Sequence, residues 1–334
     1  MQETDRFTAM IVTETAEGAF ERRIGKRTIS ELPQGEVLIR VSYSSLNYKD
    51  ALSASGNKGV TRSYPHTPGI DAAGEVILSD DDGFKKGDPV LVTGYDLGMN
   101  TAGGFGQFIR VPADWVVPLP AGLDFRRAMI YGTAGFTAGL GIHHLLTSGL
   151  TPDQGEILVT GATGGVGSLA VAILAKLGFT VVAASGKSDQ NEYLMGLGAN
   201  RCVAREAVVD DSRRPLLKQQ WAGVYECVGG PALETALRAT KRHGTVVCCG
   251  NVASGELHMT VYPFILRGVR LIGVDSATTG MALRRQVWDR LADDWRPDGL
   301  EGLADDIGLG ELDDNIERIL KGLQVGRKVV RLNS

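Results

Sequence analysis

The chain has 334 residues, of which 43% are hydrophobic and 22% are charged, the composition of an ordinary globular protein. This length exceeds the usual size of one hydrophobic core, so we expect two domains. The 35 basic and 39 acidic residues give a net charge of -4, which leaves no basic excess for a phosphate backbone, and we expect no nucleic-acid partner.

The first residues are polar and acidic, unlike a secretory signal, and the longest apolar stretch, residues 169–175, is too short to cross a bilayer. We therefore expect no export and no membrane partner. The cysteines lie between residues 202 and 249, without C-x-x-C spacing or a regular disulfide pattern. We interpret Cys202, Cys227, Cys248 and Cys249 as buried thiols of a cytoplasmic protein.

Short alternating segments, punctuated by glycine and proline, fill about the first 125 residues. Their spacing predicts a small, mostly antiparallel β-barrel. The candidate strands are residues 36–41, 73–77, 89–92 and 107–111. A last apolar segment, residues 328–332, is expected to rejoin this domain, which would make the second domain an insertion.

From Met129 onward, helical stretches alternate with continuous apolar runs of strand length. Unalternated apolar strands separated by helices are typical of a parallel sheet covered on both faces. The candidate strands are residues 156–160, 180–185, 224–228, 245–249 and 269–274. We therefore predict an α/β chain with a barrel domain of residues 1–128 and 277–334 and a doubly wound parallel-sheet domain of residues 129–276.

A glycine-rich turn at residues 161–167, Gly-Ala-Thr-Gly-Gly-Val-Gly, stands between a strand that ends at Thr160 and a helix predicted over residues 166–177. At such a place backbone amides and the helix dipole bind a pyrophosphate. Ala162 departs from the G-x-G-x-x-G pattern, and the alternative is a turn that only tightens the strand–helix junction. Because the flanking strands and helix agree with a nucleotide-binding unit, the turn predicts a dinucleotide site.

The end of the second strand favours NADPH over NADH. Domains that prefer NAD carry an Asp or Glu there for the ribose hydroxyls, whereas this chain has Ser185-Gly186-Lys187. A hydroxyl and a cation suit the extra phosphate of NADP, although Lys187 alternatively is a solvated residue that opens the next helix. Arg205, just beyond the third apolar segment, is a second candidate cation that spacing alone neither favours nor disfavours.

Longer strings accompany the turn. They are Ser-Ser-Leu-Asn-Tyr-Lys-Asp at residues 44–50 and further strings at residues 68–74, 132–138, 263–267 and 273–276. With these strings the chain resembles the medium-chain dehydrogenase/reductase superfamily over essentially its whole length. Within it, the strings are similar to those of the zinc-free acryloyl-CoA reductase (NADPH) group, often labelled quinone oxidoreductase-like.

This resemblance implies a GroES-like β-barrel catalytic domain, a Rossmann domain, a homodimer, and reduction of the carbon–carbon double bond of acryloyl-CoA to propanoyl-CoA with NADPH. It also implies a set of residues that touch the cofactor. They are Tyr48, Thr163, Gly164, Gly165, Val166, Ser185, Gly186, Lys187, Arg205, Asn251, Ile265 and Ser276.

The zinc-binding branch of the superfamily carries a cysteine early in the chain and Gly-His-Glu where this chain has Gly69-Ile70-Asp71. No cysteine precedes residue 202, and His66 is the lone histidine of the first 140 residues, beside a Pro-Gly turn. We read His66 as structural, and we expect neither a catalytic nor a structural zinc ion.

Reduction of an enoyl thioester needs a hydride at the β-carbon, stabilisation of an enolate and a proton at the α-carbon. The cofactor supplies the hydride, and the group that stabilises the enolate stays open. For the proton we select Tyr48, a phenol that is protonated at neutral pH, with Asn47 and Asp50 beside it as further catalytic candidates. In the alternatives, Tyr48 packs on the nicotinamide while water delivers the proton, and Asn47 and Asp50 only fix the loop.

Two other functions compete with this prediction. One is reduction of a quinone or another activated alkene on the same scaffold. The other is a nucleotide-binding protein without turnover, such as a redox sensor or a structural protein, which the fold also permits.

Overall fold

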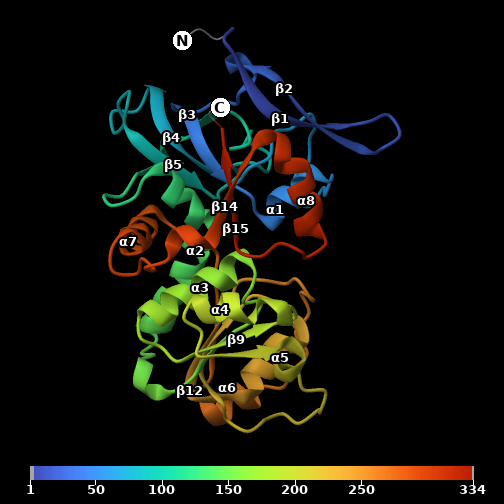
Figure 1. The fold of residues 1–334 in the computed structure, drawn as a ribbon, viewed down its shortest axis with the longest axis vertical. Helices are drawn as coiled ribbons and strands as arrows, with labels where there is room; N and C mark the ends of the chain where they lie inside the picture. Colours follow the sequence, from blue (N-terminus) through green and yellow to red (C-terminus); the bar gives the residue numbers. More distant parts are fainter. Residues whose placement is uncertain (1–3, 333–334) are drawn as a thin grey trace. The chain divides into compact units, whose positions relative to one another are not determined.

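The computed structural model describes residues 4–332 (Figure 1). They divide into two units: unit 1 comprises the residues up to 133 together with 277–292 and those from 300 onward, and unit 2 comprises 134–276 and 293–299. The first boundary lies inside helix α2 (Phe125–Thr147), just after a kink at Gly132, where φ is 49°. The domain limits expected from the sequence, after residues 128 and 276, stay a prediction.

The main sheet of unit 1 has the strand order β14-β15-β3-β4-β5-β7, and β6 also pairs with β3. All its pairings are antiparallel except that of β14 with β15, which confirms the antiparallel character predicted for this region. The strands are β3 (Val37–Ser45), β4 (Asp71–Ser79), β5 (Pro89–Thr93), β6 (Phe108–Val111), β7 (Val117–Pro118), β14 (Ala304–Gly308) and β15 (Arg327–Arg331).

The last strand of the chain returns to the first unit, as predicted. In β15, Val330 lies opposite Ser44 of β3, and Figure 1 shows the red strand beside the blue one. The remaining elements of unit 1 include a two-stranded antiparallel sheet and three helices. They are β1 (Arg6–Glu14), β2 (Phe20–Thr28), α1 (Tyr48–Ala54), α7 (Met281–Ala292) and α8 (Leu312–Leu320).

Unit 2 contains a parallel sheet with the order β10-β9-β8-β11-β12-β13. Numbered within the unit, this order is 3-2-1-4-5-6, that of dinucleotide-binding domains, in which ligands bind beyond the carboxyl ends of the two central strands. The strands are β8 (Ile157–Val159), β9 (Val181–Ser185), β10 (Arg201–Ala204), β11 (Trp221–Glu226), β12 (Thr240–Cys248) and β13 (Arg270–Gly273). The prediction of a doubly wound parallel sheet is therefore confirmed.

Four further helices of unit 2 are α3 (Gly165–Lys176), α4 (Asn191–Gly196), α5 (Gly230–Ala239) and α6 (Tyr262–Arg267). The apolar runs become strands because both sheet faces are covered: every residue of β9 and of β11 is buried. Short 3₁₀ helices are η1 (Ile29–Glu31), η2 (Ala113–Trp115), η3 (Pro152–Gln154), η4 (Ser188–Gln190), η5 (Arg205–Val208), η6 (Leu300–Leu303) and η7 (Leu309–Glu311). Across residues 4–332, no helix is long and apolar enough to span a membrane.

Candidate active site

The glycine-rich turn lies where the strand order of unit 2 reverses, between β8 and β11. Gly161 has φ 58°, a conformation that favours glycine, and Gly164 is the N-cap of α3. A side chain at Gly167 would place its Cβ 2.3 Å from the carbonyl oxygen of Gly161, so only glycine lets the helix pack so closely on the turn. The turn therefore has the strand–turn–helix geometry that a pyrophosphate requires.

Two residues of the predicted cofactor set meet at the start of the turn. The hydroxyl oxygens of Thr163 and Ser185 lie 3.3 Å apart, and the Ser185 hydroxyl accepts a 3.0 Å hydrogen bond from the backbone N–H of Lys187. Ser185 ends β9, so the hydroxyl and the lysine follow the strand next to β8.

Arg205 joins this group because β10 pairs with β9, with Ala204 opposite Ser185. A Cβ built on Gly186 would lie 2.9 Å from the Cδ atom of Arg205, so the arginine side chain runs across Gly186. That side chain is 75% exposed and pairs with Glu206 through a 2.8 Å contact. The structure thus brings together the hydroxyl and the arginine, with Lys187 adjacent in the chain, at the end of the second strand.

The other predicted cofactor residues lie along the later strands and helices of unit 2. Asn251 follows β12, and its Cα would be 3.1 Å from a Cβ on Gly229. Ile265 lies on α6 and is 67% exposed, whereas the Ser276 hydroxyl accepts a 2.8 Å hydrogen bond from Thr137. Their contact with a cofactor stays a prediction.

A buried carboxylate that the sequence analysis missed lies at the same end of the sheet. Glu226 ends β11 and accepts hydrogen bonds from the Thr160 hydroxyl and from the backbone N–H groups of Val228 and Gly229, each at 2.9 Å. Burial raises the pKa of Glu226 from its ordinary value, although these donors oppose the shift. Glu226 therefore ties the end of β8 to the turn after β11, on either side of the reversal point. Its signal in the sequence was a lone acid inside an apolar run.

In unit 1, Tyr48 begins the seven-residue helix α1 and is 47% exposed. Its neighbours are buried: Asn47, the N-cap, is 9% exposed and Asp50 is 0% exposed. Asp50 accepts hydrogen bonds from the backbone N–H of Asn47 at 2.8 Å, from the Asn47 amide at 3.2 Å and from the backbone N–H of Ile70 at 2.8 Å. These contacts fix the loop that presents the Tyr48 phenol.

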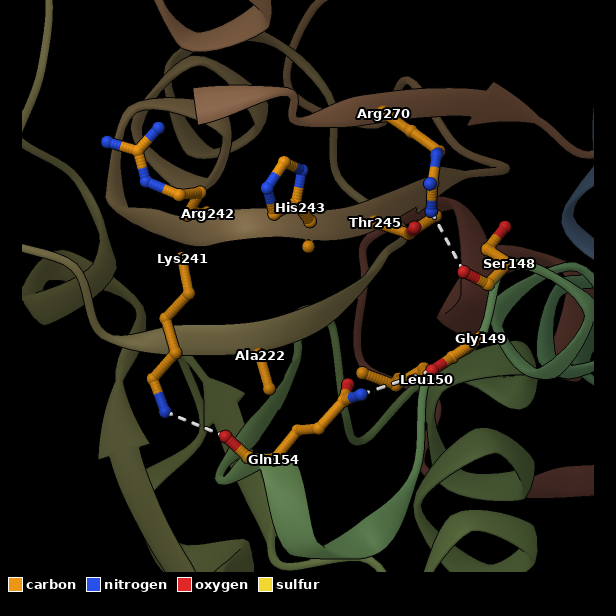
Figure 2. Close-up of a pocket in the computed structure, with 11 residues that line it drawn as sticks. Ser148, Gly149, Leu150, Gln154, Ala222, Lys241, Arg242, His243, Thr245 and Arg270 are labelled. Carbon is orange, nitrogen blue, oxygen red and sulfur yellow. Dashed lines mark hydrogen bonds between the residues drawn. The ribbon is translucent and has the colours of Figure 1, made fainter. Parts of the chain in front are cut away.

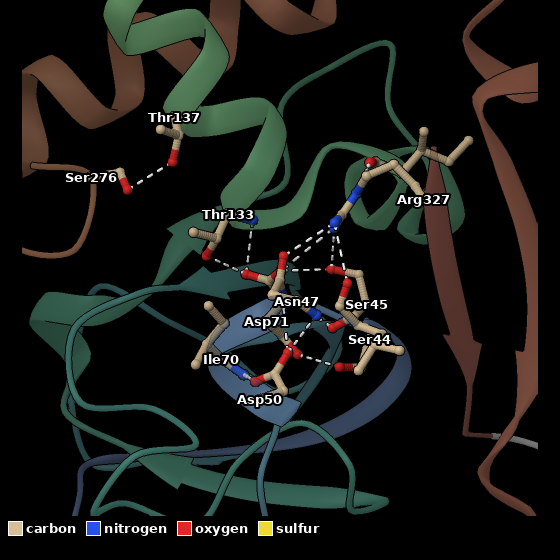
Figure 3. A network of polar contacts seen from close by, with 12 residues as sticks. Ser44, Ser45, Asn47, Asp50, Ile70, Asp71, Thr133, Thr137, Ser276 and Arg327 are labelled. Atoms are coloured by element: carbon tan, nitrogen blue, oxygen red, sulfur yellow. Dashed lines mark hydrogen bonds and ion pairs between the residues drawn. The ribbon is translucent and has the colours of Figure 1, made fainter. Parts of the chain in front are cut away.

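Figure 3 shows this loop within a wider polar network, in which Asn47, Asp71 and Arg327 point toward one another. The Asp71 carboxylate accepts hydrogen bonds from the Asn47 amide at 2.7 Å, from Ser45 at 2.5 Å and from the backbone and hydroxyl of Thr133 at 2.9 and 2.6 Å. Arg327 lies 3.9 Å from Asp71 and is 2% exposed.

Arg327 also donates to the Ser45 hydroxyl at 2.7 Å, to the Asn47 side-chain oxygen at 3.1 Å and to the carbonyl oxygens of Leu46 and Ile130 at 3.2 and 3.0 Å. A Cβ on Gly132 would lie 2.4 Å from the Asp71 carboxylate, which explains a glycine at the kink of α2. The network therefore joins the end of β3, the start of β4 and the kink of α2 to the start of β15.

The electrostatics of the network are those of two buried acids that share one cation. Burial and the neighbouring charge of Asp71 raise the pKa of Asp50 to about 7, against the effect of its three donors. Burial lowers the pKa of the Arg327 guanidinium, and Asp71 and Asp50 partly oppose that shift. Removal of the cation would leave the buried Asp71 carboxylate without the cation that lies 3.9 Å from it.

These residues do not suit a zinc ion. Both oxygens of Asp71 already accept hydrogen bonds from Ser45, Asn47 and Thr133, and His66, which is 5% exposed, contacts the Gly98 carbonyl oxygen at 2.9 Å. Within residues 4–332, no group of three or more His, Cys, Asp or Glu side chains is placed to hold a metal ion. The donor set thus lacks the three or four converging ligands that zinc sites use.

A separate cavity of about 440 Å³ lies near the amino ends of β12 and β13, whereas the glycine-rich turn lies at the carboxyl end of the parallel sheet (Figure 2). It is lined by Lys241 near the start of β12 and Arg270 at the start of β13, together with Arg242 and His243. Because the glycine-rich turn follows the carboxyl end of β8, this cavity is distinct from the turn.

The cysteines are free thiols, as expected, but the expectation that they are buried is wrong. Each of the cysteines is free and only partly buried. Cys227, Cys248 and Cys249 gather at the carboxyl ends of β11 and β12, where side chains next to a turn keep some access to solvent.

The chain is similar to proteins of established families. Residues 33–121 match the alcohol dehydrogenase GroES-like domain, and residues 165–293 match the family described as zinc-binding dehydrogenase. A putative quinone oxidoreductase, YhfP of Bacillus subtilis, is 45% identical over 92% of this chain and 94% of its own length. Acrylyl-CoA reductase AcuI of Ruegeria pomeroyi is 44% identical over 98% of this chain and 100% of its own length.

Solved structures agree over nearly the whole chain. The yhdH oxidoreductase from Salmonella enterica in complex with NADP has a TM-score of 0.95 and 43% identity, covering 98% of this chain and 100% of its own. The Bacillus subtilis protein yhfP with NAD bound has a TM-score of 0.96 and 42% identity, with the same coverage. With identity above 40% over 92% to 98% of its length, this chain belongs to the medium-chain dehydrogenase/reductase superfamily of oxidoreductases, with a GroES-like domain and a Rossmann-type domain.

Proposed function

We propose that this protein reduces the carbon–carbon double bond of acryloyl-CoA with NADPH, and so forms propanoyl-CoA. The observation that carries the cofactor assignment is the end of β9, where the Ser185 hydroxyl, Lys187 and the Arg205 guanidinium stand in place of a carboxylate. Two cations suit the 2′-phosphate of NADP, which an acid would repel. The NADP complex of the yhdH oxidoreductase supports this assignment, whereas yhfP was solved with NAD, so the comparison of NADPH with NADH tests it.

The glycine-rich turn, residues Thr163, Gly164, Gly165 and Val166, would hold the pyrophosphate of the cofactor at the start of α3. The backbone N–H of Gly164 donates a 2.9 Å hydrogen bond to the Gly161 carbonyl oxygen, so the N–H groups of Thr163, Gly165 and Val166 would be the donors to the phosphates. Ser185, Gly186, Lys187 and Arg205 would hold the adenosine phosphate. Asn251, Ile265 and Ser276 would line the remainder of the site. When bound, NADPH supplies the hydride that the β-carbon receives.

Tyr48 is the residue we propose as the proton donor to the α-carbon. Its half-exposed phenol stands at the start of α1, between the buried polar side chains of Asn47 and Asp50. Asn47 and Asp50 act through this loop as positioning residues, since their polar atoms are used by Ile70, Asp71 and Arg327. The catalytic role first expected of Asn47 and Asp50 thereby becomes one of holding Tyr48 in place.

Reduction of a quinone is the second candidate, because one similar protein is named a putative quinone oxidoreductase. Both reactions begin with hydride transfer from the same cofactor. The two differ in the acceptor, so the names of similar proteins support both and a direct comparison separates them.

The test measures kcat/KM for acryloyl-CoA, crotonyl-CoA and 1,4-benzoquinone with NADPH, and then for acryloyl-CoA with NADH. We expect the highest value with acryloyl-CoA and NADPH, and propanoyl-CoA as the product by mass spectrometry. With NADPH deuterated at C4, the deuterium should appear at the β-carbon. A higher kcat/KM for the quinone, after subtraction of the enzyme-free rate, would overturn the choice of substrate, and NADPH binding without turnover would favour a non-catalytic role.

A homodimer and a cytoplasmic location are also proposals. Two features support the homodimer. Strand β13 is an edge strand of its sheet, and in the preceding helix α6 the side chains of Ile265 and Leu266 are 67% and 50% exposed. An exposed apolar surface beside a sheet edge is typical of a protein interface. Light scattering coupled to size-exclusion chromatography should give twice the mass of the 35.6 kDa chain.

A further inference from the structure

Two thiols lie in contact at the carboxyl edge of the parallel sheet. Glu226 and Cys248 are the last paired residues of β11 and β12, so Cys227 and Cys249 are the next residue along each strand. Their sulfur atoms are 3.7 Å apart, and the backbone N–H of Cys249 donates a 3.0 Å hydrogen bond to the carbonyl oxygen of Glu226. Both residues are partly exposed.

This placement suits a disulfide bond. Neighbouring residues of adjacent strands have Cα atoms about 4.8 Å apart, inside the usual range of about 4.4–6.8 Å for disulfides. The sulfur atoms need to approach by about 1.7 Å to reach bonding distance, which rotation of the two side chains can supply. Cys248 is adjacent to Cys249 in the chain, but side chains alternate between the faces of a strand, so Cys248 packs with the apolar cluster of the sheet instead.

Cys227 also touches the segments that the proposed function assigns to the cofactor. A Cβ on Gly161 would lie 3.4 Å from the Cβ atom of Cys227, and the N–H of Cys227 donates to the Thr160 hydroxyl at 2.9 Å. A Cβ on Gly250 would lie 2.1 Å from the carbonyl oxygen of Cys227, so the turn before Asn251 is packed against it as well. A movement of Cys227 would therefore displace the glycine-rich turn, which it contacts.

We propose that Cys227 and Cys249 form a reversible disulfide with a peroxide as oxidant, and that this bond weakens NADPH binding. The second half of the proposal rests on the proposed function, whereas the first half does not. Neither half depends on the identity of the substrate that is reduced.

The chemistry is balanced by two steps. The Cys249 thiol loses its proton to solvent, and the thiolate attacks hydrogen peroxide, which forms a sulfenic acid and releases a hydroxide that takes up that proton as water. The Cys227 thiol then attacks that sulfur, forms the S–S bond and releases water. Two thiols and one peroxide thus give one disulfide and two waters. Cys249 acts first because the hydrogen bond from Cys249 and burial raise the pKa of the Cys227 thiol well above its usual range.

The first experiment counts thiols. Reduced protein is treated with hydrogen peroxide, denatured, labelled with N-ethylmaleimide without reductant, and weighed intact. We expect the four labels of the reduced chain to fall to two, with a loss of 2 Da for the bond and a Cys227–Cys249 peptide on digestion. Cys202→Ser and Cys248→Ser are matched controls that should still lose two labels, whereas Cys227→Ser should lose none to a disulfide and should give a sulfenic acid at Cys249 that dimedone traps.

The second experiment measures the dissociation constant of NADPH by fluorescence. We expect oxidised protein to bind NADPH at least about tenfold more weakly than reduced protein, with full recovery after dithiothreitol; tenfold corresponds to about 1.4 kcal/mol. The Cys248→Ser variant should respond as the parent does, and Cys249→Ser should not respond. Peptide mapping of the parent decides the bond even if a variant fails to fold.

Four labels after oxidation, or a bond that involves Cys202 or Cys248, would overturn the disulfide. A bond with an unchanged dissociation constant would overturn its effect on the cofactor. Reduced protein that binds no NADPH would overturn the proposed function and with it that effect, while the thiol count would still decide the bond.

Discussion

Substitution of Arg327 by methionine tests how the buried network holds the catalytic loop. The guanidinium lies 3.9 Å from Asp71 and interacts with Asp50, and it donates four hydrogen bonds, to Ser45, Leu46, Asn47 and Ile130. Methionine keeps the length and apolar stem of the side chain but none of these donors. The variant therefore isolates the cation and its hydrogen bonds from packing.

The expected loss of stability follows from the burial of the partners. Asp71 and Asp50 are each 0% exposed, and removal of one partner from a buried ion pair typically costs about 3–5 kcal/mol. For a unit of this size, each kcal/mol lowers the melting temperature by about 2–4 °C. We expect the Arg327→Met variant to melt about 6–20 °C below the parent in scanning calorimetry at a fixed scan rate.

The matched control is Arg331→Met on the same strand, whose side chain is exposed. Surface substitutions of this kind usually change stability by less than about 0.5 kcal/mol. In the double variant Arg327→Met/Asp71→Asn, the loss should be smaller than the sum of the two single losses, because one uncompensated charge is gone. An Arg327→Met protein that melts with the Arg331→Met control would refute the assignment of Arg327 as the counter-charge of the network.

Three further outcomes are expected. The pKa of Asp50 is raised from 3.8 to about 7 in the folded state, so the folded protein keeps a proton that the unfolded chain loses. The stability that this proton contributes is present below about pH 4 and is lost as the pH rises to about 7, at up to about 1.4 kcal/mol per pH unit. The Asp50→Asn variant should therefore show a flatter slope of unfolding free energy against pH in urea titrations. The Lys187→Ala variant should have a KM for NADPH about 10–100-fold higher, since a charged hydrogen bond contributes about 1.5–3 kcal/mol, and a KM for NADH within about twofold of the parent. Lys218→Ala is the control, and equal effects on both cofactors would argue against a contact with the 2′-phosphate. Tyr48→Phe should slow single-turnover reduction by about 10²–10⁴-fold, and a rate within a few-fold of the parent would remove Tyr48 as the acid.

Local patterns made the parallel sheet and the phosphate-binding turn predictable. A turn such as residues 161–167 carries its information in consecutive residues, and its place between a strand and a helix follows from the apolar runs on either side. The same is true of Ser185 and Lys187, which stand at a strand end defined by its own sequence. The contact of Arg205 with Gly186 could not be predicted from local sequence, because it depends on the pairing of β10 with β9.

The buried network escaped prediction because its members are distant in sequence. Asp50, Asp71 and Arg327 become neighbours only when β3 pairs with β4 and β15 pairs with β3. Asp50 and Asp71 next to apolar runs were a detectable sign of buried acids, but nothing local connects them with an arginine at residue 327. The contact between Cys227 and Cys249 likewise escaped prediction, because it exists only when β11 pairs with β12.

The return of β15 to unit 1 has a consequence for the order in which this chain acquires its structure during synthesis. Residues 134–276 are synthesised as one continuous segment that contains strands β8 to β13, so the sheet of unit 2 can form before the last strand of unit 1 is made. Until residue 327 emerges, Asp50 and Asp71 have no arginine to accompany them into the interior. Burial of Asp50 and Asp71 therefore depends on the final strand. A nascent chain without β15 keeps these two acids in solvent, and only the finished chain can bury the loop around Tyr48.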